Sequence, residues 1–293
     1  MTQEARIDTD APGPGQAPTL PAPDASPTPV AEDALRGIDT SVPNVARMYD
    51  LLLGGKENFA SDRQAAEELI RLVPDAVKAA NNNRIFLRRA VSFLAKEASV
   101  RQFIDIGTGL PTQGNVHEVA QRAHADARVL YVDNDPVVIA HAQALLADNA
   151  TVVAINRDLR DPQEILSHPA LQALINLEEP FAVLLVAVLH FIRDADNPRA
   201  IVKTLVDAMP SGSYLVISHT TAENVSASVM NQIWQLYDRA TAPAAPRSHS
   251  EIESFFDGLD ILPPGLVDVS SWRTNASAKP ARTIFYAAVG SKR

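Results

Sequence analysis

The chain has 293 residues, of which 46% are hydrophobic, and a formal net charge of −9. This length and apolar content allow a substantial core, in one large domain or in one domain with a small appendage. The absence of cysteine excludes disulfides, thiolate metal sites and a cysteine nucleophile. No block of Lys and Arg is present to neutralise phosphates, which argues against nucleic acid as a partner. Because no apolar run approaches the ~20 residues of a membrane span and no secretory signal is visible, we expect a cytoplasmic protein without a membrane partner.

Residues 1–33 are predicted to form a disordered tail. Seven prolines fall between Pro12 and Pro29, and six acidic residues face a single basic one, which gives the tail a charge of −5. Few large apolar side chains are present to offset the entropy lost on ordering. The simplest interpretation is a passive, solubilising tail.

Residues 34–100 are predicted to form a helical lid that precedes the first strand. Asn44 is placed to cap a first helix, which two glycines end. Ser61 and Gln64 have the spacing of a capping box ahead of a second helix. A third helix is expected over residues 82–98, and no strand pattern interrupts the segment.

From residue 101 onward, short apolar segments alternate with amphipathic ones. Strands are expected over residues 101–106, 128–132, 151–155, 181–189, 213–218, 266–270 and 283–289. Helices are expected over residues 112–125, 136–148, 161–177 with a break near Pro169, 198–209, 223–239 and 248–258. This alternation predicts an α/β domain over residues 101–293, in which helices cover both faces of a mainly parallel sheet.

The end of the first strand carries the clearest site pattern. The strand runs into Asp105-Ile106-Gly107-Thr108-Gly109, and a helix follows. Glycines at such a turn let the backbone bend tightly and let a ligand approach it, and the next helix directs its positive end to the same place. The pattern indicates a nucleotide-type cofactor, although a plain strand-to-helix turn produces a similar spacing.

Acidic residues also follow the second and third strands. Asp133 ends the second strand, where a carboxylate is able to accept hydrogen bonds from both hydroxyls of a ribose. Asp158 follows the third strand and is placed to accept from the amino group of adenine. Helix capping is the alternative role for these acids, and the neighbouring Asp135 and Asp161 are also placed for it.

Together these positions resemble the class I S-adenosylmethionine (SAM)-dependent methyltransferases. The resemblance covers residues 101–290 and implies a Rossmann-like, seven-stranded sheet whose last strand is antiparallel. It implies SAM as the cofactor, with the glycine turn facing its methionine part and the two acidic strand ends facing its ribose and adenine. The residues that it places around SAM are Asp105, Gly107, Thr108, Gly109, Asp133, Asn134, Asp158, Leu159 and Val188. Pro111 stands where many members have a third glycine, so the turn must differ after Gly109.

Three further stretches resemble one narrower group. Residues 43–59 read PNVARMYDLLLGGKENF, residues 83–90 read NRIFLRRA, and residues 105–112 read DIGTGLPT. These are similar to the signature of an S-adenosyl methyltransferase family formerly called domain of unknown function 574. With them, the resemblance covers about residues 36–290.

Helices before the first strand are able to fold over the cofactor cleft and exclude water. In that arrangement we expect Tyr49 or Asn58 to contact the sulfonium or carboxylate of SAM, and Arg84 to pair with the carboxylate. The alternative is an ordinary surface segment in which Arg47 and Asp50 form an i, i+3 pair.

Two histidines lie at the carboxyl ends of predicted strands. His190 follows Val188 and Leu189 at the end of the fourth strand, and His219 follows the fifth. Either is a candidate general base for an oxygen or nitrogen acceptor, and lining the cofactor pocket is the alternative for His190. The remaining histidines show no ligand spacing, so no metal site is expected.

Methyl transfer requires alignment and exclusion of water more than a dedicated set of catalytic groups. We therefore expect transfer from SAM to an oxygen or nitrogen atom of a small-molecule acceptor. An NAD-dependent oxidoreductase is one alternative, but its third glycine would fall at Thr112. A SAM-binding sensor without turnover is the other, because binding and catalysis use the same cleft.

Overall fold

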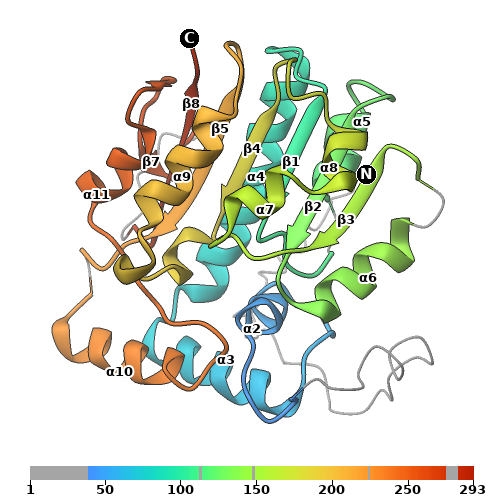
Figure 1. The fold of residues 1–293 in the computed structure, drawn as a ribbon. Coiled ribbons are helices and arrows are strands. Elements are labelled where there is room, and N and C mark those ends of the chain that lie inside the picture. Colours follow the sequence, from blue (N-terminus) through green and yellow to red (C-terminus); the bar gives the residue numbers. More distant parts are fainter. Residues whose placement is uncertain (1–38, 112–113, 147–148, 224, 275–282) are drawn as a thin grey trace, which may run out of the picture. The chain divides into compact units, whose positions relative to one another are not determined.

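The computed structural model describes residues 39–111, 114–146, 149–223, 225–274 and 283–293. The predicted tail at residues 1–33 lies outside these ranges. One compact unit covers Gly37–Arg293. In this unit a central sheet is covered by helices, and further helices gather at the carboxyl ends of its parallel strands (Figure 1). No helix among the described residues combines the length and apolar character needed to cross a bilayer.

The sheet has eight strands in the described part of the chain, in the order β3-β2-β1-β4-β5-β8-β6, with β7 also paired to β8. Strands β1 to β5 pair in parallel, and β8 is antiparallel to β5. The strands are β1 (Gln102–Ile106), β2 (Arg128–Asp133), β3 (Val152–Asn156), β4 (Ala182–Val186), β5 (Tyr214–Thr220), β6 (Asp260–Ile261), β7 (Val267–Asp268) and β8 (Phe285–Ser291). The Rossmann-like sheet with an antiparallel last strand is confirmed. The predicted count of seven is one short because the two-residue β6 is too brief to give a periodic pattern.

The helices follow the predicted alternation, and most are shorter than predicted, but the helix expected over residues 82–98 begins earlier, at Ala76. They are α2 (Val45–Leu52), α3 (Ala60–Leu72), α4 (Ala76–Lys96), α5 (Val116–Gln121), α6 (Pro136–Leu146), α7 (Pro162–Leu166), α8 (Pro169–Leu174), α9 (Pro198–Asp207), α10 (Ala227–Tyr237) and α11 (His249–Glu253), with 3₁₀ turns η1 (Leu189–Phe191), η2 (Asp194–Asp196) and η3 (Ser254–Phe256). The break at Pro169 is confirmed, because a proline ring cannot continue the helix that precedes it.

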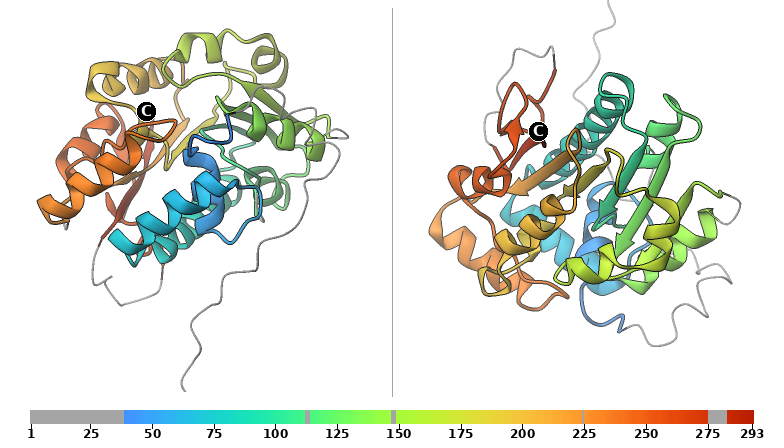
Figure 2. Two further views of the ribbon diagram at one scale, coloured as in Figure 1. Left: turned by 90° about the horizontal axis from the view of Figure 1, so that it is seen from below. Right: turned by 45° about the horizontal axis from the view of Figure 1, so that its top comes forward.

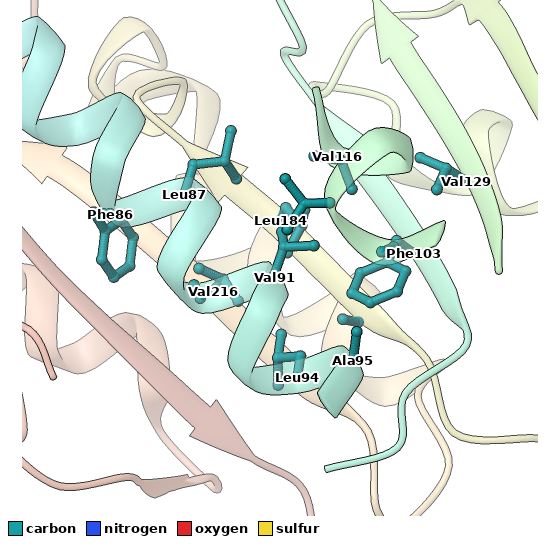
Figure 3. Packing of buried hydrophobic residues seen from close by; sticks show 14 of the residues in the cluster. Phe86, Leu87, Val91, Leu94, Ala95, Phe103, Val116, Val129, Leu184 and Val216 are labelled. Carbon is teal, nitrogen blue, oxygen red and sulfur yellow. The ribbon is translucent and has the colours of Figure 1, made fainter. Parts of the chain in front are cut away.

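Successive side chains of the strands enter two separate cores. Phe103 of β1 packs into a core with α4, α5 and α6, whereas Ile104 packs into a core with α7, α8 and α9. Figure 3 shows the first core, in which Val91 and Leu94 of α4 lie near Phe103 and Val216 of the sheet. Burial on both faces explains why these strands read as continuous apolar runs rather than as alternating ones.

A third core lies at the edge of the sheet where the parallel strands end. It joins α2, α3 and α10, which we call the helical cap, and includes Met48, Leu69 and Ile233. In the left view of Figure 2, the orange α10 lies beside the blue cap helices. The predicted lid of residues 34–100 contains α2 and α3 but lacks α10, which comes from the chain after β5.

Local hydrogen bonds explain where the cap helices begin. Asn44 caps α2 as predicted, since its Oδ1 accepts from the amides of Ala46 and Arg47. The capping box predicted at Ser61 and Gln64 is wrong. Instead α3 begins at Ala60, and the side chain of Asp62 reaches back to accept from the amide of Phe59 at 2.8 Å.

Candidate active site

A cavity of about 540 Å³ opens at the carboxyl ends of β1, β2, β3 and β4. Within the sheet, β2 and β3 lie on one side of β1, and the chain then returns to place β4 on the other side of β1. Ligands of open α/β sheets bind at such a reversal of strand order. Residues of α2, α4 and the loop 241–243 complete the walls. The predicted cofactor edge of the sheet therefore does hold a cavity.

The predicted glycine turn forms the floor of this cavity. Gly107 and Gly109 have φ angles of +72° and +65°, which side-chain-bearing residues rarely adopt. A Cβ added to Gly107 would lie 2.3 Å from Cγ2 of Val188. The glycine thus allows β1 and the end of β4 to approach closely, and it leaves backbone exposed to a ligand. Thr108 also lines the cavity and donates from Oγ1 to Asp105 at 3.2 Å.

Asp133 lies at the end of β2 and fixes the glycine turn. Its Oδ2 accepts from the amide of Gly109, and its Oδ1 accepts from the amide of Asp135, both at 2.9 Å. Burial raises the pKa of Asp133 to about 6. The backbone donors at Asp135, Gly109 and Asn134 do not use all four lone pairs of the carboxylate, so it is able to accept a further hydrogen bond. Asp135 caps α6 through Val137, so the capping role falls to Asp135 and leaves Asp133 at the cavity wall.

Asp105 and Arg84 both line the cavity, and the charge of Arg84 acts on the carboxyl group of Asp105. Burial raises the pKa of Asp105 to about 6, and the positive charge of Arg84 opposes that rise. Arg84 extends from α4, and its Nη2 donates to Asn115 at 3.3 Å. Its buried Nε has no hydrogen-bond partner among the described residues. A carboxylate in the cavity would satisfy that donor, as the sequence predicted for this arginine.

Asp158 lies on the cavity wall beyond β3, next to the buried Leu159. Burial pushes the pKa of Asp158 up, but hydrogen bonds from Arg160 and Asn134 outweigh it and hold the pKa below its usual value. The bond from Asn134 measures 3.3 Å. Asp161 stands at the N-cap position of α7, but its side chain makes no capping hydrogen bond. The structure therefore brings Asn134, Asp158 and Leu159 together.

The two predicted lid contacts differ in their placement. Tyr49 lines the cavity, whereas Asn58 does not appear on its walls. The amide group of Asn58 donates instead to Asp50 at 3.1 Å and to the carbonyl of Gly55 at 3.2 Å. Asn58 thereby holds the turn that follows α2, and the structure gives no support to a contact with SAM.

Arg47 connects the helical cap to the cofactor edge. Its Nε lies 2.8 Å from Asp62 of α3, and its Nη1 lies 3.6 Å from Asp135, with all three side chains buried. The alternative of a surface pair between Arg47 and Asp50 is wrong, because Arg47 is buried against Asp62 and Asp135, and Asp50 binds the turn after α2. Sequence spacing could not reveal a triad whose members come from three separate elements.

Neither predicted general base reaches the cavity walls. His190 lies in η1, because β4 ends at Val186 and not at the predicted residue 189, and its ring packs 5.5 Å from His219. Burial lowers the pKa of His190 well below its usual value and that of His219 to about 3. Nε2 of His219 accepts from Arg247 at 3.0 Å, and Nδ1 donates to the carbonyl of Thr220 at 2.8 Å. Both imidazoles are therefore neutral and buried in the core.

Several residues of the cavity wall carry no local sequence signal for a site. Asn83 lies within the NRIFLRRA stretch, and Ala187, Phe191 and Pro243 belong to no site pattern. Ala187 has a φ of +58°, and its amide donates to Oγ of Ser218 at 3.0 Å. A non-glycine residue in this left-handed conformation often marks a functional site. No property of the isolated sequence signals such strain.

The similarity to known proteins agrees with this geometry. A family model described as S-adenosyl methyltransferase matches residues 31–293. The chain belongs to this family. A crystal structure of a member from Streptomyces avermitilis, formerly assigned to domain of unknown function 574, is 39% identical, with a TM-score of 0.82, and the match covers 87% of this chain and 99% of that one. A structure from Thermobifida fusca is 36% identical, with a TM-score of 0.82, and the match covers 87% and 97%. No curated protein showed a significant match.

The family resemblance inferred from the sequence is thus confirmed, and the NAD-dependent alternative receives no support. SAM is the cofactor of the S-adenosyl methyltransferase family. The cavity fits it on three grounds: the cradle at Gly107 that a Cβ would fill, the unpartnered Nε of Arg84, and the lone pairs of Asp133. The space at Gly107 would let SAM approach the backbone closely, Arg84 would bind its carboxylate, and Asp133 would accept hydrogen bonds from its ribose hydroxyls.

Proposed function

We propose that the protein is an enzyme that transfers the methyl group of SAM to an oxygen or nitrogen atom of a small molecule. The observation that carries this proposal is that one cavity is lined both by the carboxyl ends of the parallel strands and by residues of α2, α4 and loop 241–243. A cofactor held at the sheet edge would leave the remainder of that cavity for an acceptor.

In this proposal three groups of residues hold the cofactor. Arg84 binds its carboxylate, the backbone at Gly107 borders its methionine part, and Asp133 accepts from its ribose hydroxyls. Asn134, Asp158 and Leu159 form the wall at the adenine end. When bound, SAM supplies a methyl group on a sulfonium, which a lone pair of the acceptor takes in an in-line displacement.

The helical cap contributes closure rather than chemistry. Thr241 donates from its amide to the carbonyl of Pro43 at 2.9 Å and accepts through Oγ1 from the amide of Val45 at 3.3 Å. Loop 241–243 is thereby attached to the start of α2, and both line the cavity. This enclosure excludes water and limits the acceptor to a small molecule. The buried, neutral histidines take no part in the transfer.

Cofactor binding is tested by calorimetric titration with SAM, S-adenosylhomocysteine (SAH) and NAD. Micromolar binding of SAM and SAH is expected for the native protein, with none for NAD. Asp133→Ala should weaken SAH at least about tenfold, because charge-assisted hydrogen bonds are lost. Asp161→Ala is the matched control, since that exposed carboxylate makes no capping bond and does not line the cavity. Preference for NAD, or equal losses in the two variants, would overturn the cofactor assignment.

Turnover is tested separately with methyl-labelled SAM and a panel of small phenols, alcohols and amines. Transfer of label to at least one compound, abolished in Asp133→Ala at subsaturating SAM, is expected. Tight SAM binding without label transfer to any class in the panel would contradict the proposed transfer and favour a SAM-binding sensor without turnover.

A further inference from the structure

A chain of four hydrogen bonds runs from Ala187, just after β4, through Tyr49 of the helical cap to Ala80 of α4. The amide of Ala187 donates to Oγ of Ser218 at 3.0 Å, and that hydroxyl donates to Oδ1 of Asn83 at 2.6 Å. Nδ2 of Asn83 then donates to the hydroxyl of Tyr49 at 2.9 Å, which donates to the carbonyl of Ala80 at 3.2 Å. Ala187, Asn83 and Tyr49 all line the cavity.

The direction of this chain follows from what each group is able to donate. The backbone amide of Ala187 is only a donor, so the hydroxyl of Ser218 accepts from it and directs its own proton to Asn83. Asn83 must therefore present its oxygen to Ser218 and its nitrogen to Tyr49. The carbonyl of Ala80 is only an acceptor, so it takes the single proton of the Tyr49 hydroxyl.

The hydroxyl of Tyr49 consequently has one lone pair left to accept a hydrogen bond and no proton left to donate. Its oxygen has one proton, which is used on Ala80, and two lone pairs, of which Asn83 uses one. The buried environment raises the pKa of Tyr49, so the hydroxyl stays protonated. A carboxylate has no donor to give, so the carboxylate of SAM suits Arg84 and not this oxygen.

Apolar side chains share the wall of this cavity with Tyr49. Leu87 of α4, Phe191 of η1 and Pro243 of the covering loop line the same cavity. Phe191 supplies an aromatic surface, and Leu87 and Pro243 supply aliphatic ones. These side chains suit a flat, apolar molecule with few polar atoms.

We propose that the free lone pair of Tyr49 binds and orients the hydroxyl or N–H group of an apolar, ring-containing acceptor. This inference rests on the proposed methyl transfer and specifies its substrate class. The hydrogen-bond chain holds the hydroxyl of Tyr49 in place. A substrate O–H or N–H group that donates to this hydroxyl would be held in one orientation, with its own lone pair directed away from Tyr49, so Tyr49 acts as a positioning residue. At the start of the chain the amide of Ala187, whose backbone is left-handed, donates to both the carbonyl and Oγ of Ser218, at 3.1 and 3.0 Å.

The test compares phenol with its methyl ether, anisole, on protein saturated with SAH. Dissociation constants are measured by ligand-observed NMR titration for the native protein, Tyr49→Phe and the control Tyr214→Phe. Tyr214 lies at the opposite end of β5 and does not line the cavity, so its variant removes a tyrosine hydroxyl without touching the site. The more apolar anisole is favoured by burial alone, so a preference for phenol requires a polar partner.

We expect phenol to bind about fivefold more tightly than anisole in the native protein and in Tyr214→Phe, which corresponds to one neutral hydrogen bond. In Tyr49→Phe this ratio should fall to about one or below, while the SAH dissociation constant changes less than about twofold. Equal binding of the two probes by the native protein, absence of phenol binding, or a preference that survives in Tyr49→Phe would overturn the inference.

The SAH titration separates this failure from a failure of the proposed function. A native protein that binds SAH without preferring phenol loses only the Tyr49 inference. A native protein that does not bind SAH loses the proposed function itself. If Tyr49→Phe weakens SAH about tenfold or more and leaves the phenol preference intact, the hydroxyl binds the cofactor and the inference is wrong.

Discussion

Replacing Gly107 by alanine should destabilise the protein through two separable effects. The first is the left-handed backbone, φ +72°, which costs an alanine about 1 kcal/mol relative to glycine. The second is overlap, because the new Cβ would lie 2.3 Å from Cγ2 and 2.6 Å from Cβ of Val188. Overpacking of this kind costs about 1–3 kcal/mol, so we expect a total loss of about 2–4 kcal/mol.

Gly109 supplies the matched control. Its φ is +65°, but a Cβ added there would meet nothing within 4 Å. Gly109→Ala should therefore lose only the backbone part, about 1 kcal/mol. Equilibrium unfolding in urea at pH 7.5, followed by circular dichroism, measures both losses. Combining Gly107→Ala with Val188→Ala should restore stability only in part, since the 2.6 Å approach to Cβ remains. Equal losses for the two glycine variants would refute the argument that the turn and the end of β4 are in close contact.

Three further predictions concern buried charges and titration. Arg47→Met leaves two buried carboxylates without their cation, so it should lower the free energy of unfolding by about 3–5 kcal/mol. Urea denaturation measures this change, and a loss below about 1 kcal/mol would contradict the buried triad. Because the folded-state pKa of Asp105, about 6, exceeds its unfolded value, its ionisation lowers stability as pH rises from about 4 to 6. Asp105→Asn should thus gain about 1 kcal/mol relative to the native protein between pH 5 and pH 7.5, and a relative loss over that interval would reverse the sign of the argument. The rings of His190 and His219 should stay neutral from pH 5 to 8 in NMR titrations, since burial depresses the pKa of both; a midpoint inside that range would show that one of them is accessible to solvent.

The parts of the site that lie close together in the sequence were predictable. The glycine turn, Asp133 and Asp158 each follow an apolar strand, and parallel strands place their carboxyl ends at one edge. Arg84 was predictable as a carboxylate partner only through the family resemblance. The strand–helix alternation likewise determined the fold, because its periodicities are local and strong.

The parts that depend on contacts between distant residues were not predictable. Ser218 and Asn83 are 135 positions apart, and no spacing rule connects them. The same holds for α10, which joins α2 and α3 in the helical cap although all the parallel strands, β1 to β5, separate it from them in the chain. Placement of His190 failed for a different reason. The left-handed turn at Ala187 ends β4 early and rotates the residues that follow, which an apolar run cannot reveal.

The salt bridges of Arg47 have a consequence for protein engineering. Exchanging the cap helices for those of a relative is one way to alter the walls of the cavity. Such a chimaera would inherit Asp135 from the sheet domain and would need a cation opposite it, at the place of Arg47, to neutralise a carboxylate that also caps α6. Cap and sheet domain are therefore not interchangeable modules, and a successful graft must carry this one charge across the junction.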